Sequence, residues 1–265
     1  MTTIAPENVG SEIRRSVLCV TINRPESRNA LSRATLDELK RAFRDAAGDD
    51  SLHVAVLSAA GDKNFAAGGD LKEFATLRTE IDAQQLFDRA AEALDAIRAF
   101  PVPVVAALNG TALGGGAELA MACDYRLAAA HARIGFVQST LAITTGFGGG
   151  ADLFGKVGSA RAMQILVRGE ILSASAAAAL GLVDDIAEPD ESLDHLVARF
   201  LQPFLARPPH LVRALKQIAL AHRQRLPQAV CRSIERNGFM TTWAHPAHWA
   251  AADQALTARN SKREQ

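Results

Sequence analysis

This 265-residue sequence contains few cysteines, has no net charge and lacks long apolar runs. The three cysteines, Cys19, Cys123 and Cys231, are far apart and form no CxxC pair, which argues against a disulfide framework or a zinc knuckle. We expect them to act as small buried hydrophobes. The 29 Lys and Arg residues balance 29 Asp and Glu residues, so the sequence lacks the basic excess of a general nucleic-acid binder.

Membrane-spanning and secretory segments are also not expected. No uninterrupted apolar run approaches the roughly 18 residues that a membrane span needs. Residues 1–16 carry four charged side chains and lack the apolar core of a signal peptide. We therefore expect a soluble, cytoplasmic protein that binds neither a membrane nor nucleic acid.

The length allows one large domain or two small ones, and the 48% hydrophobic content is enough for a substantial core without disorder. The composition changes near Arg207-Pro208-Pro209, and beyond this point the pattern is helical and contains no strand. We therefore expect a core at residues 1–206 and a helical C-terminal region at residues 207–265.

Strands and helices are expected to alternate in the first half of the chain. Strands are expected at 17–22, 54–57 and 102–108. Helices are expected after Ser32, a good capping residue, and between Leu86 and Pro101. This order predicts an α/β layered core with parallel strands. From Ser159 onward the pattern is mostly helical, with one extended piece at 183–186.

Two glycine-containing segments match the residue patterns of nucleotide-binding motifs, but each lacks a feature that its motif requires. Residues 150–157 lack the final Ser or Thr of a phosphate-binding loop, and residues 146–151 follow no strand. His245 and His248 are three residues apart but have no third ligand nearby in the sequence, so we expect no metal site.

Residues 109–120 form the most informative cluster, because three consecutive glycines there follow a buried strand and open an Ala/Leu-rich helix. Glycines at a helix start allow close backbone approach, and the free N–H groups at the positive end of the helix dipole favour a negative oxygen. Glu118 lies in the first helical turn. It is a candidate catalytic carboxylate, although the helix dipole alone also favours a carboxylate there.

A second loop, Ala66-Ala67-Gly68-Gly69-Asp70, has the same character, with small residues followed by a helix. Two loops that each offer one N–H would form a two-donor oxyanion hole. The sequence alone does not show that the two loops meet in space.

In their order and spacing, these segments resemble the crotonase superfamily, the enoyl-CoA hydratase/isomerase family. The resemblance extends from about Val17 to Trp243 and includes residues 23–25, 29–31, 65–71, 109–124 and 169–183. It implies an α/β fold of the crotonase (ClpP-like) type, a spiral of ββα units with a helical C-terminal trimerisation region. It also implies a homotrimer or homohexamer, an acyl-CoA thioester substrate, and no cofactor beyond the coenzyme A of the substrate.

The resemblance also implies roles for individual residues. The two amides that hold an enolate oxygen would be those of Gly69 and Gly115. Ala30, Ala67 and Asp70 would lie where the family binds coenzyme A. Arg28 is a candidate for binding the phosphates, and it is equally consistent with a solvated surface position. Trp243 would shape the acyl or pantetheine channel, or would serve only in packing.

One departure from the family pattern bears on the reaction. The hydratase pattern has a second glutamate twenty residues after the first, and here that position is Gln138. Hydration requires water to be activated and a proton to be delivered, which suits two carboxylates. Gln138 can orient water but has no usable pKa.

The segments at 112–127, 134–138, 207–216 and 242–246 resemble the ethylmalonyl-CoA/methylmalonyl-CoA decarboxylases. Decarboxylation needs no base, because the oxyanion hole takes the enolate charge and a donor then protonates carbon. Phe136, Val137 and Phe147 would form an apolar wall around the departing carboxylate, or would be ordinary core residues. Three functions therefore stay open: decarboxylation, isomerisation or hydration with Glu118 alone, and non-catalytic acyl-CoA binding.

Overall fold

The computed structural model describes residues 8–261. The prediction that the chain has no signal peptide concerns residues 1–16, and the first seven of these lie outside the described residues. The last four residues of the predicted C-terminal region lie outside them as well.

Two β-sheets form the centre of the fold. The larger sheet has six strands in the order β1-β2-β3-β5-β7-β10. Its strands pair in parallel except β1 with β2. They are β1 (Val9–Arg14), β2 (Val17–Ile22), β3 (Val54–Ala59), β5 (Val104–Leu108), β7 (Tyr125–Ala128) and β10 (Asp185–Ile186).

The smaller sheet has the order β4-β6-β8-β9. Its first three strands are parallel, and β9 is antiparallel to β8. The strands are β4 (Asn64–Ala66), β6 (Thr111–Leu113), β8 (Arg133–Gly135) and β9 (Ile171–Ser173). Residues 64–66 therefore form a strand, whereas the sequence analysis expected no strand there.

Consecutive strand pairs divide between the two sheets and are followed by helices, which repeats a ββα unit along the chain. The pair β3 and β4 precedes α2 (Leu71–Phe74) and α3 (Glu80–Arg98), and the pair β5 and β6 precedes α4 (Gly115–Ala122). The pair β7 and β8 precedes α5 (Gly150–Val157) and α6 (Ser159–Arg168). This arrangement confirms the predicted α/β class and the ββα spiral.

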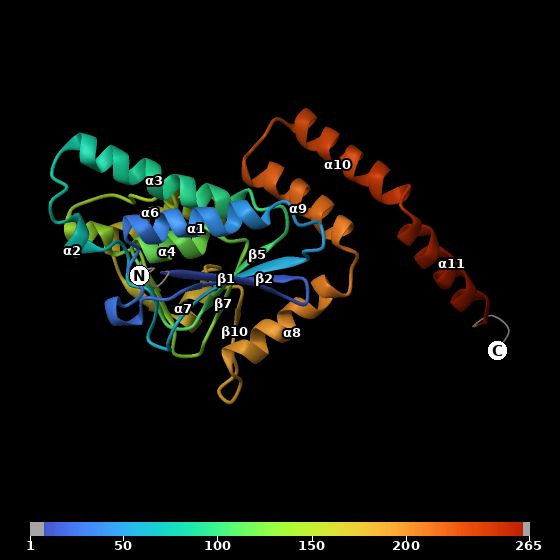
Figure 1. Ribbon diagram of the computed structural model, residues 1–265, viewed down its shortest axis with the longest axis horizontal. Coiled ribbons are helices and arrows are strands. Elements are labelled where there is room, and N and C mark those ends of the chain that lie inside the picture. The colour runs from blue at the N-terminus through green and yellow to red at the C-terminus, as the bar shows by residue number, and fades with distance from the viewer. Residues whose placement is uncertain (1–7, 262–265) are drawn as a thin grey trace, which may run out of the picture.

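Helices cover both faces of the larger sheet (Figure 1). The face with Leu18, Val20 and Ile22 joins the main core, to which α1 (Arg33–Ala46), α3 and α4 contribute. The opposite face, with Val17 and Val54, packs under α8 (Leu193–Leu205). Alternate residues of a strand point to opposite faces, so β2 contributes to both cores.

Local capping explains where several helices begin. The hydroxyl of Ser32 accepts a hydrogen bond from the Thr35 backbone N–H, as its predicted capping role requires. Thr79 and Asp82 form a reciprocal capping box at the start of α3. The helix α3 ends before Pro101, as predicted.

The later part of the chain is mostly helical, as expected. It contains α7 (Ala174–Ala179), α8, α9 (Pro209–Arg223), α10 (Gln228–Trp243) and α11 (Pro246–Ser261). In Figure 1, α10 and α11 extend away from the two-sheet body. Within residues 8–261, no helix combines the length and apolar character required to cross a membrane. The proposed domain boundary at 206/207 stays a prediction.

The cysteines partly follow the expectation. All three are free thiols; Cys123 and Cys231 are buried, whereas Cys19 is only half-buried. Burial raises the pKa of the Cys123 thiol to about 12, so this side chain stays protonated at neutral pH.

Candidate active site

The two glycine loops predicted from the sequence meet at one end of the smaller sheet. They follow β4 and β6, which are parallel neighbours with Ala66 opposite Ala112. A Cβ atom built on Gly68 would lie 3.1 Å from the Leu113 carbonyl oxygen and 3.7 Å from the Gly115 nitrogen. The loop 66–70 therefore touches the start of α4, and the parallel pairing of two short strands brings the loops together.

Glycine is required in these loops for conformational reasons. Gly68 has a φ of +103° and Gly114 has a φ of +51°, a region that side-chain-bearing residues rarely adopt. Within residues 8–261, neither the Gly69 nor the Gly115 backbone N–H donates a hydrogen bond to another atom of the chain. Both predicted donors are therefore free for a ligand oxygen, as an oxyanion hole needs.

Glu118 lies one helical turn into α4 and is only 1% exposed. Its Oε1 atom accepts from the Gly146 N–H at 3.1 Å and from Gln138 Nε2 at 2.8 Å. Its Oε2 atom accepts from the N–H groups of Phe147 at 3.0 Å and Gly149 at 2.8 Å. The four acceptor positions of the carboxylate are therefore all occupied.

Burial raises the pKa of Glu118 above its ordinary value, although the four hydrogen bonds act in the opposite direction. A buried carboxyl group with a raised pKa beside free amide donors is typical of a functional site. The same side chain holds the loop 146–149 against α4, which the sequence analysis did not anticipate.

Gln138 is buried in the 3-10 helix η2 (Val137–Leu141), and it lies against the catalytic candidate Glu118. Its Nε2 atom donates to Glu118, whereas its Oε1 atom is buried and has no hydrogen-bond partner within the described chain. An unpaired buried acceptor is costly, so this oxygen is available to a donor from a ligand or water.

Two of the three apolar candidates, Val137 and Phe147, lie beside the glycine loops. Phe136 is buried at 1% exposure, and Phe147 is buried at 6%. The Cγ2 atom of Val137 lies 3.9 Å from a Cβ atom built on Gly114. The structure therefore brings Val137 and Phe147 to the glycine loops, and both phenylalanines also belong to the main hydrophobic core.

The carboxylate of Asp70 already accepts hydrogen bonds from other residues of the chain. Its carboxylate accepts from Arg24 Nη2 at 3.0 Å and caps α2 by accepting from the Glu73 N–H. Burial opposes ionisation, but Arg24 and the α2 amides outweigh it and hold the pKa of Asp70 below its ordinary value. Arg24 also donates to the Ala30 carbonyl oxygen at 2.6 Å. The sequence analysis did not identify this arginine as the partner of two predicted site residues.

The remaining coenzyme A candidates lie on the loop 66–70 and on the segment beside it. The Arg28 carbonyl oxygen accepts from the Ala67 N–H at 3.1 Å, and the Arg28 side chain is exposed. Leu31 pairs with Gly69 in an isolated parallel bridge. Residues 28–31 and 67–70 therefore lie side by side, and Arg28, Ala30, Ala67 and Asp70 lie on these two segments. Their binding of coenzyme A stays a prediction.

Trp243 is not brought to this centre within the single chain. It lies at the end of α10, which packs against α9, and its side chain is 48% exposed. Its ring packs against Phe239, His248 and Trp249. The ring of His245 instead stacks on His210, at a centroid distance of 3.6 Å. Among residues 8–261, no group of three or more His, Cys, Asp and Glu side chains could hold a metal ion.

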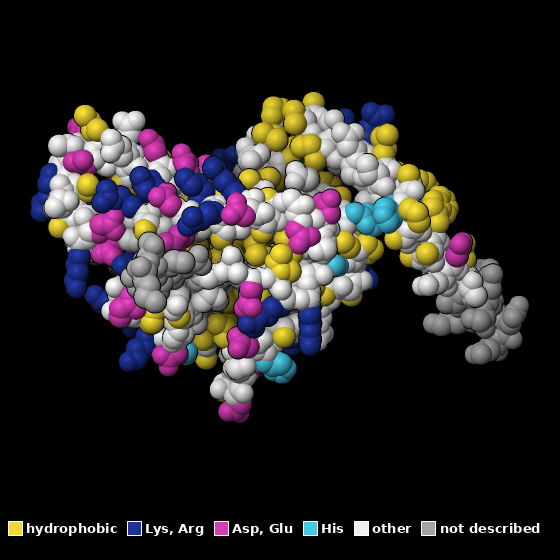
Figure 2. All heavy atoms as spheres, in the orientation of Figure 1, with side chains coloured by type: hydrophobic (Ala, Val, Ile, Leu, Met, Phe, Trp, Pro, Cys, Tyr) yellow, Lys and Arg dark blue, Asp and Glu magenta, His cyan; other side chains and the backbone are white. Residues whose placement is uncertain are grey.

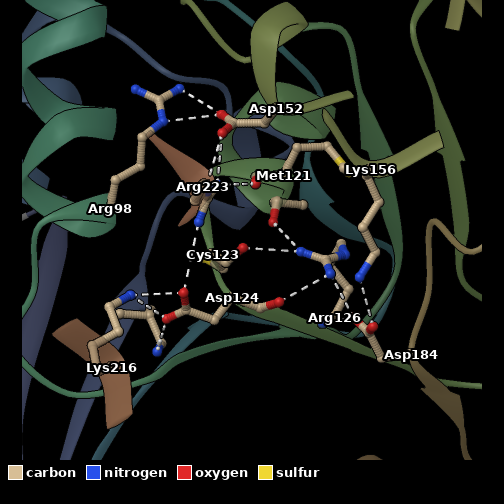
Figure 3. A network of polar contacts seen from close by, with 12 residues as sticks. Arg98, Met121, Cys123, Asp124, Arg126, Asp152, Lys156, Asp184, Lys216 and Arg223 are labelled. Atoms are coloured by element: carbon tan, nitrogen blue, oxygen red, sulfur yellow. Dashed lines mark hydrogen bonds and ion pairs between the residues drawn. The ribbon is translucent and has the colours of Figure 1, made fainter. Parts of the chain in front are cut away.

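A charged network occupies the opposite end of α4 (Figure 3). Asp152 accepts from Arg98 at 2.6 Å and from Arg223 at 2.7 Å, and Asp124 accepts from the buried amine of Lys216 at 2.5 Å. Burial lowers the pKa of Lys216, and Asp124 opposes this effect. The network attaches α9 to the body of the protein, because Lys216 and Arg223 both lie on α9.

Arg126 extends the network by pairing with Asp184 at 2.5 Å, and Lys156 also contacts Asp184. A cavity of about 660 Å³ lies beside these side chains, with Met121 and Phe154 in its wall. The residues lining it include neither oxyanion glycine and neither Glu118 nor Gln138. This cavity is therefore separate from the candidate active site.

Together, the two-sheet ββα spiral, the paired glycine amides and the buried glutamate define the crotonase class of proteins. Comparisons with known proteins agree. The enoyl-CoA hydratase/isomerase family model matches residues 12–254. The chain belongs to the enoyl-CoA hydratase/isomerase family.

Individual relatives are similar over most of their length. The crotonyl-CoA hydratase of Syntrophomonas wolfei is 37% identical over 190 residues, which cover 72% of this chain and 73% of that protein. The 2,3-dehydroadipyl-CoA hydratase of Escherichia coli is 36% identical over 227 residues, covering 85% and 86%. The crystal structure of an enoyl-CoA hydratase from Bacillus anthracis has a TM-score of 0.87 at 30% identity and covers 95% of this chain and 96% of that one.

Proposed function

We propose that this protein is an acyl-CoA enzyme that decarboxylates a small malonyl-type thioester in its oxyanion hole. One observation carries the proposal: Glu118 has all four acceptor positions occupied, and an amide, Gln138, stands where the hydratase pattern has a second acid. A carboxylate with no free acceptor position cannot take a proton from water without giving up a hydrogen bond. Decarboxylation avoids this requirement because it needs no base.

In the proposed step, the bond between the α-carbon and the substrate carboxylate breaks and carbon dioxide leaves. The electron pair of that bond moves into the thioester, and the resulting enolate oxygen is held by the N–H groups of Gly69 and Gly115. The enolate then collapses to restore the thioester carbonyl as its α-carbon takes a proton from water, and the hydroxide left behind takes up a proton from the solvent. The unpaired Oε1 atom of Gln138 can accept a hydrogen bond from this water and orient it.

The apolar surroundings favour loss of the substrate carboxylate. Phe147 is nearly fully buried beside the oxyanion glycines, and a carboxylate is less stable against an apolar wall than in water. Carbon dioxide carries no charge, so its release relieves this cost. Coenzyme A belongs to the substrate, and the proposal requires no other cofactor. The exposed guanidinium of Arg28 would bind the phosphates of coenzyme A.

Double-bond isomerisation or hydration of a 2-enoyl-CoA is the second candidate. The similar proteins from Syntrophomonas wolfei and Escherichia coli are named as hydratases, which favours it. The raised pKa of Glu118 also suits a group that accepts and returns a proton. This chemistry requires the loop 146–149 to release at least one acceptor position of Glu118. A non-catalytic acyl-CoA-binding protein would retain the oxyanion site but turn over neither kind of substrate.

A parallel mass-resolved assay with ethylmalonyl-CoA, methylmalonyl-CoA and crotonyl-CoA tests these functions. We expect carbon dioxide release from a malonyl-type thioester with little hydration of crotonyl-CoA. Efficient hydration of crotonyl-CoA without carbon dioxide release would contradict the proposal and support the second candidate. Binding of all three thioesters without turnover would support the non-catalytic function.

We also propose that the chain assembles into a homotrimer or homohexamer through its C-terminal helices. Figure 2 shows hydrophobic side chains gathered along α10 and α11. Phe239, Met240, Trp243 and Trp249 are each about half exposed there. Light scattering coupled to size-exclusion chromatography measures the assembly, and a monomer at micromolar concentration would contradict it.

A further inference from the structure

The ring of Phe147 lies against both glycines of the proposed oxyanion hole. A Cβ atom built on Gly115 would lie 2.5 Å from Phe147 Cε2 and 3.1 Å from Phe147 Cζ. A Cβ atom built on Gly69 would lie 3.5 Å from the same Cζ atom. The ring therefore fills the space next to the two amides that would hold the thioester oxygen, where the first carbons of an acyl group must lie.

The backbone holds this ring in place. The Phe147 N–H donates to Glu118 Oε2, and the N–H groups on both sides of it, at Gly146 and Gly149, bind the same carboxylate. Gly149 lies so close to Glu118 that a Cβ atom there would overlap the glutamate Cβ atom. Withdrawal of the loop would therefore expose or leave unpaired a buried carboxylate, which opposes any outward movement of Phe147.

A second ring bounds the other side of Gly69. A Cβ atom built on Gly69 would lie 2.6 Å from Phe74 Cε2. Phe74 is on the four-residue helix α2 and is only partly buried, so its packing is less complete than that of Phe147. The fixed boundary of the acyl site is therefore the Phe147 ring.

We propose that Phe147 determines the size of the acyl group that this enzyme accepts. Its ring bounds the space beside the two oxyanion amides, so that thioesters of about butyryl size fit and longer chains meet a ring that the loop 146–149 holds in place. Rigid apolar pockets discriminate against additional methylene groups, because overpacking forces neighbouring atoms to move. The inference rests on the proposed function only in taking an acyl-CoA thioester as the ligand.

Binding of saturated acyl-CoA thioesters tests this inference independently of catalysis. Acetyl-CoA, butyryl-CoA and octanoyl-CoA have neither a carboxylate to lose nor a double bond to hydrate, so calorimetry measures affinity alone. For the unmodified protein, we expect octanoyl-CoA to bind at least tenfold more weakly than butyryl-CoA. In Phe147→Ala, we expect the ratio of octanoyl-CoA affinity to butyryl-CoA affinity to rise at least tenfold.

Two further variants sharpen the result. Phe147→Leu removes less volume and should give an intermediate shift, and it carries the test if the alanine variant does not fold. Phe154→Ala is the matched control, because Phe154 lines the separate cavity at the other end of α4 and should leave the selectivity ratio unchanged. An unchanged ratio of octanoyl-CoA to butyryl-CoA affinity in the folded Phe147 variants would overturn the inference. A lack of carbon dioxide release from malonyl-type thioesters would overturn the proposed decarboxylation and leave this inference standing.

Discussion

The side-chain amide of Gln138 donates a hydrogen bond to the Glu118 carboxylate, with Nε2 2.8 Å from Oε1. This contact fixes the orientation of the amide, and its other end, Oε1, has no hydrogen-bond partner among residues 8–261. The two positions that carry carboxylates in the hydratase pattern thus form a carboxylate–amide pair. The chemistry of this pair differs from that of two carboxylates because only Glu118 can titrate.

Restoring a carboxylate in Gln138→Glu should move the enzyme toward hydration. Two carboxylates at hydrogen-bond distance cannot both ionise readily, so they share a proton and the pKa of one rises further. We expect crotonyl-CoA hydration to rise at least tenfold and decarboxylation to fall. Steady-state kinetics with both substrates measure the change. Gln138→Met is the control that removes the amide without adding an acid; equal hydration rates in the two variants would rule out this explanation.

Glu118→Gln should lower stability as well as activity. Each carboxylate oxygen accepts two hydrogen bonds, and the amide nitrogen of glutamine would meet N–H donors instead. Each buried donor left unpaired costs about 1–3 kcal/mol. We expect a lower melting temperature and faster hydrogen exchange at Gly146, Phe147 and Gly149. The exposed Glu170 provides the control Glu170→Gln, and equal melting temperatures for the two variants would contradict the prediction.

The raised pKa of Glu118 also predicts the direction of a pH effect on stability. Burial favours the protonated form, so the folded state binds this proton more tightly than the unfolded state does. The linked stabilisation is complete below the unfolded pKa of about 4.3 and is lost as the pH rises through the higher folded pKa. Urea unfolding at a series of pH values should therefore show the unmodified protein losing stability relative to Glu118→Gln as the pH rises above about 4. A parallel pH dependence of the two proteins would show that the folded pKa is not raised.

Two glycine-to-alanine substitutions a few residues apart should change the stability of the protein in opposite directions. In Gly149→Ala, the new Cβ atom would overlap Glu118, so we expect loss of activity and destabilisation of about 1–3 kcal/mol from overpacking. Gly155 lies inside α5 with no atom within 4 Å of a Cβ position, so Gly155→Ala should stabilise the protein by about 0.5–1 kcal/mol. Denaturant unfolding and the rate assay together measure both effects. Similar activity in both variants would contradict the proposed contact between the loop and Glu118.

The Lys216–Asp124 pair should be important for attachment of α9. The Lys216 side chain is 2% exposed, and removal of one partner from a buried ion pair costs about 3–5 kcal/mol. We expect Lys216→Met to cost about 3 kcal/mol, because Asp124 still accepts from the Val104 N–H. The double variant Lys216→Met/Asp124→Asn should recover part of this loss in urea unfolding. Strictly additive effects would show that the two side chains are not coupled.

Much of this protein could be predicted because its signals are local in the sequence. Strand and helix alternation, the Ser32 cap and the two glycine loops each occupy a few consecutive residues, and their order indicated the family and the ββα spiral. Glu118 was identified from its place in the helix after the glycine triplet, and Gln138 from the family pattern that the sequence resembles. The strands β1, β4, β6, β7, β8 and β9 were not anticipated. Five of them have only three or four residues, too few alternations to give a periodic signal, and β1 is exposed at every residue but Val9.

The tertiary structure alone decided what surrounds the catalytic candidates. Arg24 reaches Asp70 across 46 residues, and the loop 146–149 reaches Glu118 across about 30. Residues 146–151 match a nucleotide-binding pattern only in their letters, yet their glycines allow the close approach to Glu118 that occupies its oxygens and holds Phe147 against the oxyanion glycines. Composition and spacing determined which chemical groups the chain carries. Only long-range packing decided which of their hydrogen-bonding positions are occupied and which remain free, because that depends on segments that meet only when the two sheets assemble.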